Sequence, residues 1–183
     1  HDGRITWEHD RTWLGVSDPD FSYGLNVEAS YKAFDFSMFW QGVVGNTVWN
    51  DWKTYSDFWN VHVQKGVNHP TRLLNAWSPS NPDSSIPALS LINPNDELRA
   101  STYFLESGSY LKLRQIEFGY NIPESALSVV GVKRARVALS AQNLISLRKW
   151  WGDDAYTGID PESPAANSYV RPQMFFLNLN VSL

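Results

Sequence analysis

The sequence predicts an all-β protein, and more specifically a segment of a transmembrane antiparallel β-barrel. Apolar and polar residues alternate over runs of ten or more, which places them on opposite faces of a strand. Such runs match the roughly 9–11 residues of a tilted membrane strand and exceed the roughly 5–6 of a typical soluble strand. Short and long connections alternate between the runs, as they do in outer-membrane barrels.

The first two strands are expected at about residues 20–32 and 34–45. In the first strand, polar residues occupy the even positions, and the odd positions carry Phe21, Tyr23, Leu25, Val27, Ala29 and Tyr31. The second strand continues with Phe34, Phe36, Met38 and Trp40 on one face. Because only Lys32 and Ala33 separate the two patterns, they predict a tight antiparallel turn. Residues 1–18 are expected to be the end of a preceding extracellular loop.

A long interruption at residues 46–109 predicts an extracellular loop rich in Asn, Pro and Ser. Within it, residues 51–65 have the spacing of one amphipathic helix, with Asp51 as its N-cap and Gly66 at its end. Trp52, Tyr55 and Trp59 lie on the apolar stripe of this helix.

Three more strands are expected at about residues 110–122, 132–146 and 171–183. Leu111 and Leu113 are out of phase with Ile116, which predicts a bulge or a change of environment near Arg114. Residues 123–131 form a short connection with room for one helical turn, and residues 147–170 form a second long extracellular loop. Gly24 and Gly119 are expected on the polar face, where they would allow strand curvature.

Alternation alone does not identify the face that meets lipid, since a soluble ligand-binding barrel alternates with its apolar residues inside. The strand lengths and the loop asymmetry favour a membrane barrel. So do the charges on the polar face, which suit a wet lumen: Glu28, Lys32, Asp35, Glu117 and Arg136. Five strands cannot close a barrel in lipid, because an open edge leaves backbone groups unsatisfied. The chain is therefore expected to be the end of a larger barrel.

Composition argues against several functional classes. The chain of 183 residues has 15 Lys+Arg against 19 Asp+Glu, a poor balance for binding nucleic acid. It has no Cys and four His, none of them a helical i, i+4 pair, so no metal site or cofactor is expected. The acidic residues Asp153, Asp154, Asp160 and Glu162 have irregular spacing and are interpreted as solvated or capping rather than catalytic. No enzyme activity is expected.

Several phrases, in order along nearly the whole chain, resemble the C-terminal region of the SusC/RagA family of TonB-linked outer-membrane proteins. They are DRTWLG (10–15), PDFSYGLN (19–26), YKAFDF (31–36), QGVVG (41–45), WSPSNP (77–82), SGSYLKLR (107–114), GYNIP (119–123), AQNL (141–144) and DPE (160–162). The family usually ends in Phe, whereas this chain ends in Leu183.

The resemblance implies the last five strands of a 22-stranded barrel in the bacterial (Bacteroidota-type) outer membrane, without the N-terminal plug or the TonB box. It implies TonB-dependent nutrient uptake of oligosaccharides or peptides, so the expected partners are the rest of the barrel and its plug, TonB, a SusD-like surface lipoprotein and lipid. The alternative is a secreted β-sandwich or barrel that binds carbohydrate through exposed Trp residues.

Candidate site residues follow from the strand pattern and the Trp-rich loops. The expected lipid-facing residues are Tyr23, Leu25, Val27, Phe36, Phe118, Val137, Leu177 and Leu179. Aromatic residues near the strand ends fit an interfacial girdle: Tyr31, Phe34, Trp40 and Tyr120. Loop aromatics are candidates for stacking on a substrate, or for packing in the loops or on the lid: Trp49, Trp77, Trp150 and Trp151.

Overall fold

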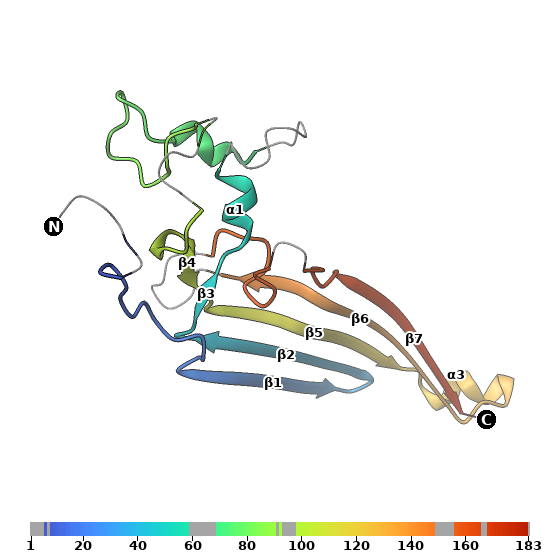
Figure 1. Ribbon diagram of the computed structural model, residues 1–183. Coiled ribbons are helices and arrows are strands. Elements are labelled where there is room, and N and C mark those ends of the chain that lie inside the picture. Colours follow the sequence, from blue (N-terminus) through green and yellow to red (C-terminus); the bar gives the residue numbers. More distant parts are fainter. Residues whose placement is uncertain are drawn as a thin grey trace.

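The computed structural model describes residues 6, 8–58, 69–90, 92, 98–148, 156–165 and 168–182. Its main feature is a curved five-stranded antiparallel sheet (Figure 1) with the order β1-β2-β5-β6-β7. The strands are β1 (Phe21–Tyr31), β2 (Phe34–Val44), β5 (Tyr110–Asn121), β6 (Arg134–Leu147) and β7 (Met174–Ser182). The predicted all-β antiparallel architecture is thus confirmed, as an open sheet with β1 and β7 at its edges.

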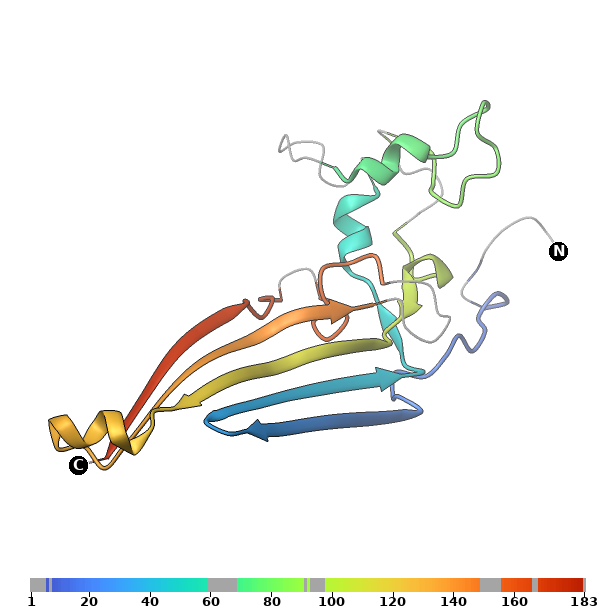
Figure 2. The same ribbon diagram turned by 180° about the vertical axis from the view of Figure 1, so that it is seen from behind.

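The connections divide the sheet into two ends. At the turn end, Tyr31 pairs with Phe34 across a two-residue turn, and Lys32 takes a left-handed φ of 54°. The other connection at this end contains α3 (Glu124–Leu127) and η4 (Ser128–Val130), and it includes Gly131 at φ 70°. The opposite end, here called the loop end, carries the long segments that rise above the sheet in Figures 1 and 2. Both predicted short connections are confirmed.

A bulge interrupts β5 at Arg114. The register shifts between Leu113 and Gln115 against β6, and between Phe39 and Trp40 against β2. The extra residue restores the phase, because it places Leu113 on the same face as Ile116. The bulge predicted near Arg114 is confirmed.

The first long loop contains a second, smaller sheet that the sequence did not predict. β3 (Thr47–Trp49) pairs with β4 (Leu105–Ser107), so the two ends of the loop run together as they leave β2 and β5. Three-residue strands are too short to produce a recognisable alternation. The loop also contains α1 (Trp52–Ser56), η2 (Thr71–Asn75) and η3 (Thr102–Phe104). None of the described helices has the length and apolar content needed to cross a bilayer.

The helix prediction for residues 51–65 was wrong in two respects. Helix α1 ends at Ser56, because Asp57 and Phe58 turn inward and are 2% and 4% exposed. Asp51 makes no capping hydrogen bond with its side chain; the Asn50 Oδ1 atom accepts the Trp52 backbone N–H instead, at 3.2 Å. Residues 59–65 of the predicted helix lie outside the described residues.

The last strand starts later than predicted, at Met174 rather than at about residue 171. Pro172 cannot donate a ladder hydrogen bond, which disfavours pairing there.

Candidate functional site: a two-faced sheet with docked loops

The apolar face of the main sheet is largely open. Strand register places all eight residues that were predicted to face lipid on this one face, with Phe36 opposite Phe118 and Val137 opposite Leu179. Leu177 is 75% exposed and Leu179 is 65% exposed, although both are large apolar residues. Among the described elements, the main packing is between neighbouring strands of the sheet, with a smaller contact between α3 and β6. This face therefore has the composition of a buried surface without a described protein layer over it.

The predicted girdle residues lie near the two ends of the same face. Phe34 and Tyr120 pack together at the turn end, with ring centroids 4.8 Å apart, and Tyr31 is 70% exposed beside them. Trp40 lies toward the loop end, where its Nε1–H donates to the Met38 sulfur at 3.3 Å. The aromatic residues therefore bracket the aliphatic part of the face.

On the polar face, an ion cluster crosses three strands at the turn end. The Arg136 guanidinium pairs with Asp35 on β2 and with Glu117 on β5, the latter at 2.7 Å. Gly119 makes this possible, since a Cβ there would lie 2.3 Å from Arg136 Nη2 and from Asp35 Oδ1. Space at Gly24 is similarly limited by the Phe39 ring, at 3.1 Å. Within the described sheet, these glycines accommodate cross-strand side chains of the sheet itself.

The substitution Gly119→Ala is expected to destabilise the sheet by about 1–3 kcal/mol, the typical cost of inserting a methyl group into filled space. The added Cβ would displace the Arg136–Asp35 pair. Gly24→Ala serves as the control, because the Phe39 ring that faces it is 39% exposed and can move. The measurement is the thermal unfolding midpoint of the two variants. Equal midpoints would contradict the proposed role of Gly119.

A second ion cluster also lies on the polar face, but at the loop end of the sheet. It holds the last long loop against β5. It consists of Tyr110, Lys112 and Arg114 of β5 together with Asp160 and Glu162. Lys112 is 5% exposed, and its Nζ lies 2.6 Å from a carboxylate oxygen of each acidic residue. Arg114 also pairs with Glu162 and donates from Nε to Gln41 Oε1 at 2.8 Å. The bulge thus gives Arg114 a role in holding the loop.

The pKa of Glu162 reflects this docking. Burial alone would raise the pKa, but hydrogen bonds from Arg114, Lys112 and Tyr110 outweigh burial and lower it to about 2. A carboxyl group with a lowered folded-state pKa contributes stability that is complete above its ordinary pKa of 4.5. That contribution is lost as the pH falls toward 2.

Loop docking is therefore expected to weaken between about pH 4.5 and pH 2. Amide hydrogen exchange of residues 156–162 measures docking directly. Glu162→Gln should remove the part of the pH dependence that this carboxyl group causes, leaving the response of other acidic residues. The interpretation fails if the variant and the parent protein have the same pH profile.

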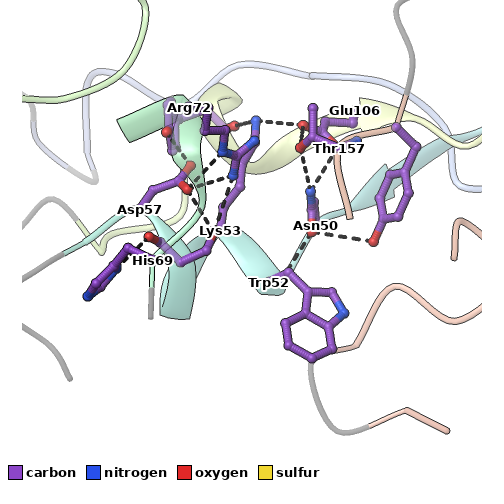
Figure 3. A network of polar contacts seen from close by, with 11 residues as sticks. Asn50, Trp52, Lys53, Asp57, His69, Arg72, Glu106 and Thr157 are labelled. Carbon is purple, nitrogen blue, oxygen red and sulfur yellow. Dashed lines mark hydrogen bonds and ion pairs between the residues drawn. The ribbon is translucent and has the colours of Figure 1, made fainter. Parts of the chain in front are cut away.

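A buried polar network joins the two long loops above the sheet (Figure 3). The Asn50 amide donates to Glu106 at 2.8 Å and to Thr157 Oγ1 at 3.0 Å, while the Tyr156 hydroxyl donates to Asn50 Oδ1 at 3.3 Å. Thr157 donates to Glu106 from its backbone N–H and from its hydroxyl. Burial raises the pKa of Tyr156 to about 12. The carboxyl pKa of Glu106 is lowered, since hydrogen bonds from Lys53 and Thr157 outweigh burial.

The network continues through Asp57, which is the anchor of the loop segment after α1. Its Oδ1 accepts from Arg72 at 2.6 Å, and its Oδ2 accepts from the Tyr103 hydroxyl at 2.5 Å. Burial, reinforced by Asp57, raises the pKa of Tyr103. Lys53 connects the two halves by reaching Glu106 at 2.8 Å and the Tyr103 carbonyl at 2.6 Å. We call the assembly of β3, α1, η2, β4 and residues 156–158 the loop platform.

Of the four Trp residues predicted to contact substrate, the structure describes Trp49 and Trp77, which lie in different parts of the first long loop. Trp49 stacks on Phe104 at 4.7 Å and is 37% exposed, so one of its faces is used for packing. Trp77 lies in a separate turn and is 45% exposed. Trp52 points away from the polar network in Figure 3. Trp150 and Trp151 lie outside the described residues.

Sequence reasoning missed the ion pairs made by two acidic residues of the last long loop. Asp160 and Glu162 were interpreted as solvated or capping; Asp160 does cap a turn by accepting the Glu162 backbone N–H at 3.0 Å, but both carboxylates are also ion-paired, and Asp160 is only 7% exposed. The period-2 spacing of Tyr110, Lys112 and Arg114 was the available signal, because it places two cations on one face. In the part of the chain that the structure describes, no group of three His, Asp or Glu side chains is arranged to hold a metal ion.

Comparisons with known proteins agree with this architecture. TonB-dependent receptor P3 of Formosa agariphila is 33% identical, over 86% of this chain and 14% of that protein. TonB-dependent receptor SusC of Bacteroides thetaiotaomicron is 30% identical, over 88% of this chain and 15% of that protein. The chain therefore spans about one seventh of the length of these receptors. No protein-family model matches it.

Solved structures give the same result. A structure described as the RagAB peptide transporter matches with a TM-score of 0.67 and 26% identity, over 86% of this chain and 17% of that chain. The RagAB peptide importer in its open-open state matches with a TM-score of 0.75 over 97% of this chain and 19% of that chain; at 24% identity it shows the fold alone. Sequence and fold together identify the chain as a homologue of the SusC/RagA-type TonB-dependent receptors, corresponding to a small part of their length.

Proposed function

We propose that the chain is the C-terminal barrel segment of a TonB-dependent outer-membrane importer for large nutrients. The observation that carries the proposal is the two-faced sheet: one face exposes large apolar residues, while the other carries ion clusters that span several strands. Lipid on the first side and a wet lumen on the second satisfy both faces. The residues predicted to face lipid would form the outer wall, with their aromatic neighbours at its borders.

The orientation follows from the loops. Long connections of outer-membrane barrels face the outside and short turns face the periplasm. The loop platform would therefore be extracellular, and the connections at the turn end would be periplasmic. The open edges β1 and β7 would pair with strands supplied by the rest of the barrel, because unpaired edges are not tolerated in lipid. The lumen side would face a plug, and TonB would act through parts of the protein beyond this segment.

The substrate class and the partner are the finer parts of the proposal. The 26%-identical structure is described as the RagAB peptide transporter. We propose oligosaccharides or peptides as cargo and a SusD-like surface lipoprotein over the loop platform. On this reading the protein moves its substrate without converting it, so it is not an enzyme. The alternative of a secreted carbohydrate-binding sandwich has less support, since among the described elements no second sheet covers the apolar face.

Fractionation tests this proposal. The polypeptide that carries this sequence should be found in the outer membrane, should require detergent for extraction and should have a denatured mass several times 20.8 kDa. A strain that lacks it should lose TonB-dependent growth on its nutrient. A water-soluble 20.8 kDa protein that unfolds cooperatively without detergent would contradict the proposal and favour the carbohydrate-binding alternative.

A further inference from the structure

Two adjoining cavities lie between the loop platform and the polar face. The first, of about 560 Å³, lies among Trp52, Arg72 and Thr157; the second, of about 200 Å³, lies among Lys112, Ser146 and Arg171. Arg148 and Ile159 line both cavities. The two cavities therefore adjoin at Arg148 and Ile159, and we call the pair the groove; its lining residues come from the loops and from β6.

Among the residues that the structure describes, those lining the groove carry more positive than negative charge. Arg72 is paired with Asp57 and Lys112 with Asp160 and Glu162, so these two cations are already compensated. Arg148 donates to the Gly158 carbonyl, which is a neutral acceptor, and Arg171 is exposed with no hydrogen bond or ion pair to another described residue. Among the described residues, Asp160 is the carboxylate that lines the groove, and Lys112 already holds it. This excess of positive charge is local, since the whole chain has a net charge of −4.

The segment that carries Arg171 is fixed in place by its neighbours. The Asn143 amide donates to the Pro172 carbonyl at 3.1 Å, and the Gln173 amide donates to the Leu144 carbonyl at 2.9 Å. Asn143 itself has a left-handed φ of 55°, which marks an irregularity in β6 beside the groove. These two hydrogen bonds directly follow Arg171 in the chain and hold the adjoining backbone against β6, and Arg171 lines the second cavity.

We propose that Arg148 and Arg171 form a carboxylate-binding site for the transported ligand. The proposal rests on the function proposed above and adds a substrate class: cargo that bears carboxylate groups, from either acidic sugars or acidic peptide side chains. Arginine suits this task, because its planar fork of N–H donors binds a carboxylate through two parallel hydrogen bonds. Ser146 lines the same cavity and is a further polar residue there. The site lies where cargo would pass from the loops to the lumen.

The test uses the full-length protein in detergent and two acidic probes, tetragalacturonate and tetraglutamate, with maltotetraose and tetraglutamine as neutral counterparts. Calorimetry should show at least one acidic probe binding roughly 10-fold or more tightly than its neutral counterpart, with binding that weakens as salt is raised. The acidic probe that binds distinguishes a sugar source of the carboxylate from a peptide source.

Two arginine substitutions test whether the acidic probe binds in the groove. Arg171→Gln should weaken binding of the acidic probe roughly 10-fold to 100-fold, as expected for loss of a charge-assisted hydrogen bond. Arg134→Gln is the matched control, since Arg134 is an exposed arginine at the turn end of β6. The proposal is overturned if neither acidic probe binds better than its neutral counterpart, or if Arg171→Gln binds like the parent protein. Neither result would affect the importer proposal, which membrane fractionation tests separately.

Discussion

Replacing Leu177 with arginine is expected to destabilise the membrane-inserted protein by about 2–4 kcal/mol, the cost of a cation on the lipid face near the bilayer centre. Leu177 lies midway along β7 opposite Leu139, and its side chain is 75% exposed. In a soluble protein, a substitution at such an exposed position would change the stability by about 0.5 kcal/mol or less. A membrane-barrel wall and a soluble sheet therefore predict losses of stability of different size for Leu177→Arg.

The neighbouring substitution Phe176→Arg is the matched control. Phe176 pairs with Ser140 on the polar face, so its arginine would enter the proposed wet lumen. The measurement is the stability of the folded barrel in bilayers, followed by the heat-dependent mobility of the unboiled protein. Equal stability of the two variants, or greater harm from Phe176→Arg, would contradict the assignment of the faces.

The substitution Lys112→Met is expected to weaken strongly the docking of the last long loop onto β5. Removing one member of a buried ion pair typically costs about 3–5 kcal/mol, because the remaining charge stays buried without compensation. Here the substitution would leave Asp160 without its cation, while Glu162 would keep Arg114 and Tyr110. We expect the segment around Asp160 to leave β5 rather than the whole sheet to unfold, since the strands pair independently of this contact.

Hydrogen exchange and limited proteolysis of residues 156–162 measure this release. The double variant Lys112→Met, Asp160→Asn should recover much of the lost protection, because it removes the uncompensated charge. Lys133→Met, at an exposed lysine beside the turn end, should leave the segment protected. Normal protection in the single variant would show that the ion pairs do not hold the loop.

The sheet could be predicted from sequence because its information is local. Alternation along each strand specifies its two faces, and the phase break before Ile116 located the bulge at Arg114. These features depend on neighbours two residues apart. They required no knowledge of which distant strand would pair with which.

The loops could not be predicted in the same way, since their contacts join residues that are far apart in sequence. Asn50 contacts Glu106 and Thr157, and Lys112 contacts Asp160. The helix after Asn50 was predicted too long because the Trp and Tyr spacing suggested one stripe, whereas burial of Asp57 beside Arg72 ends it at Ser56. Tertiary contacts override local spacing where a charged side chain finds a buried partner.

Residue-by-residue accessibility along β7 tests the central claim most directly. This chain contains no cysteine, so single spin-labelled cysteines can be introduced at positions 175–181 in a full-length background free of other cysteines. In bilayers, oxygen accessibility should peak at positions 175, 177, 179 and 181, and accessibility to a water-soluble nickel reagent should peak at the positions between them. Water exposure on both faces, or the opposite phase, would contradict the account of this sheet as part of a membrane barrel wall.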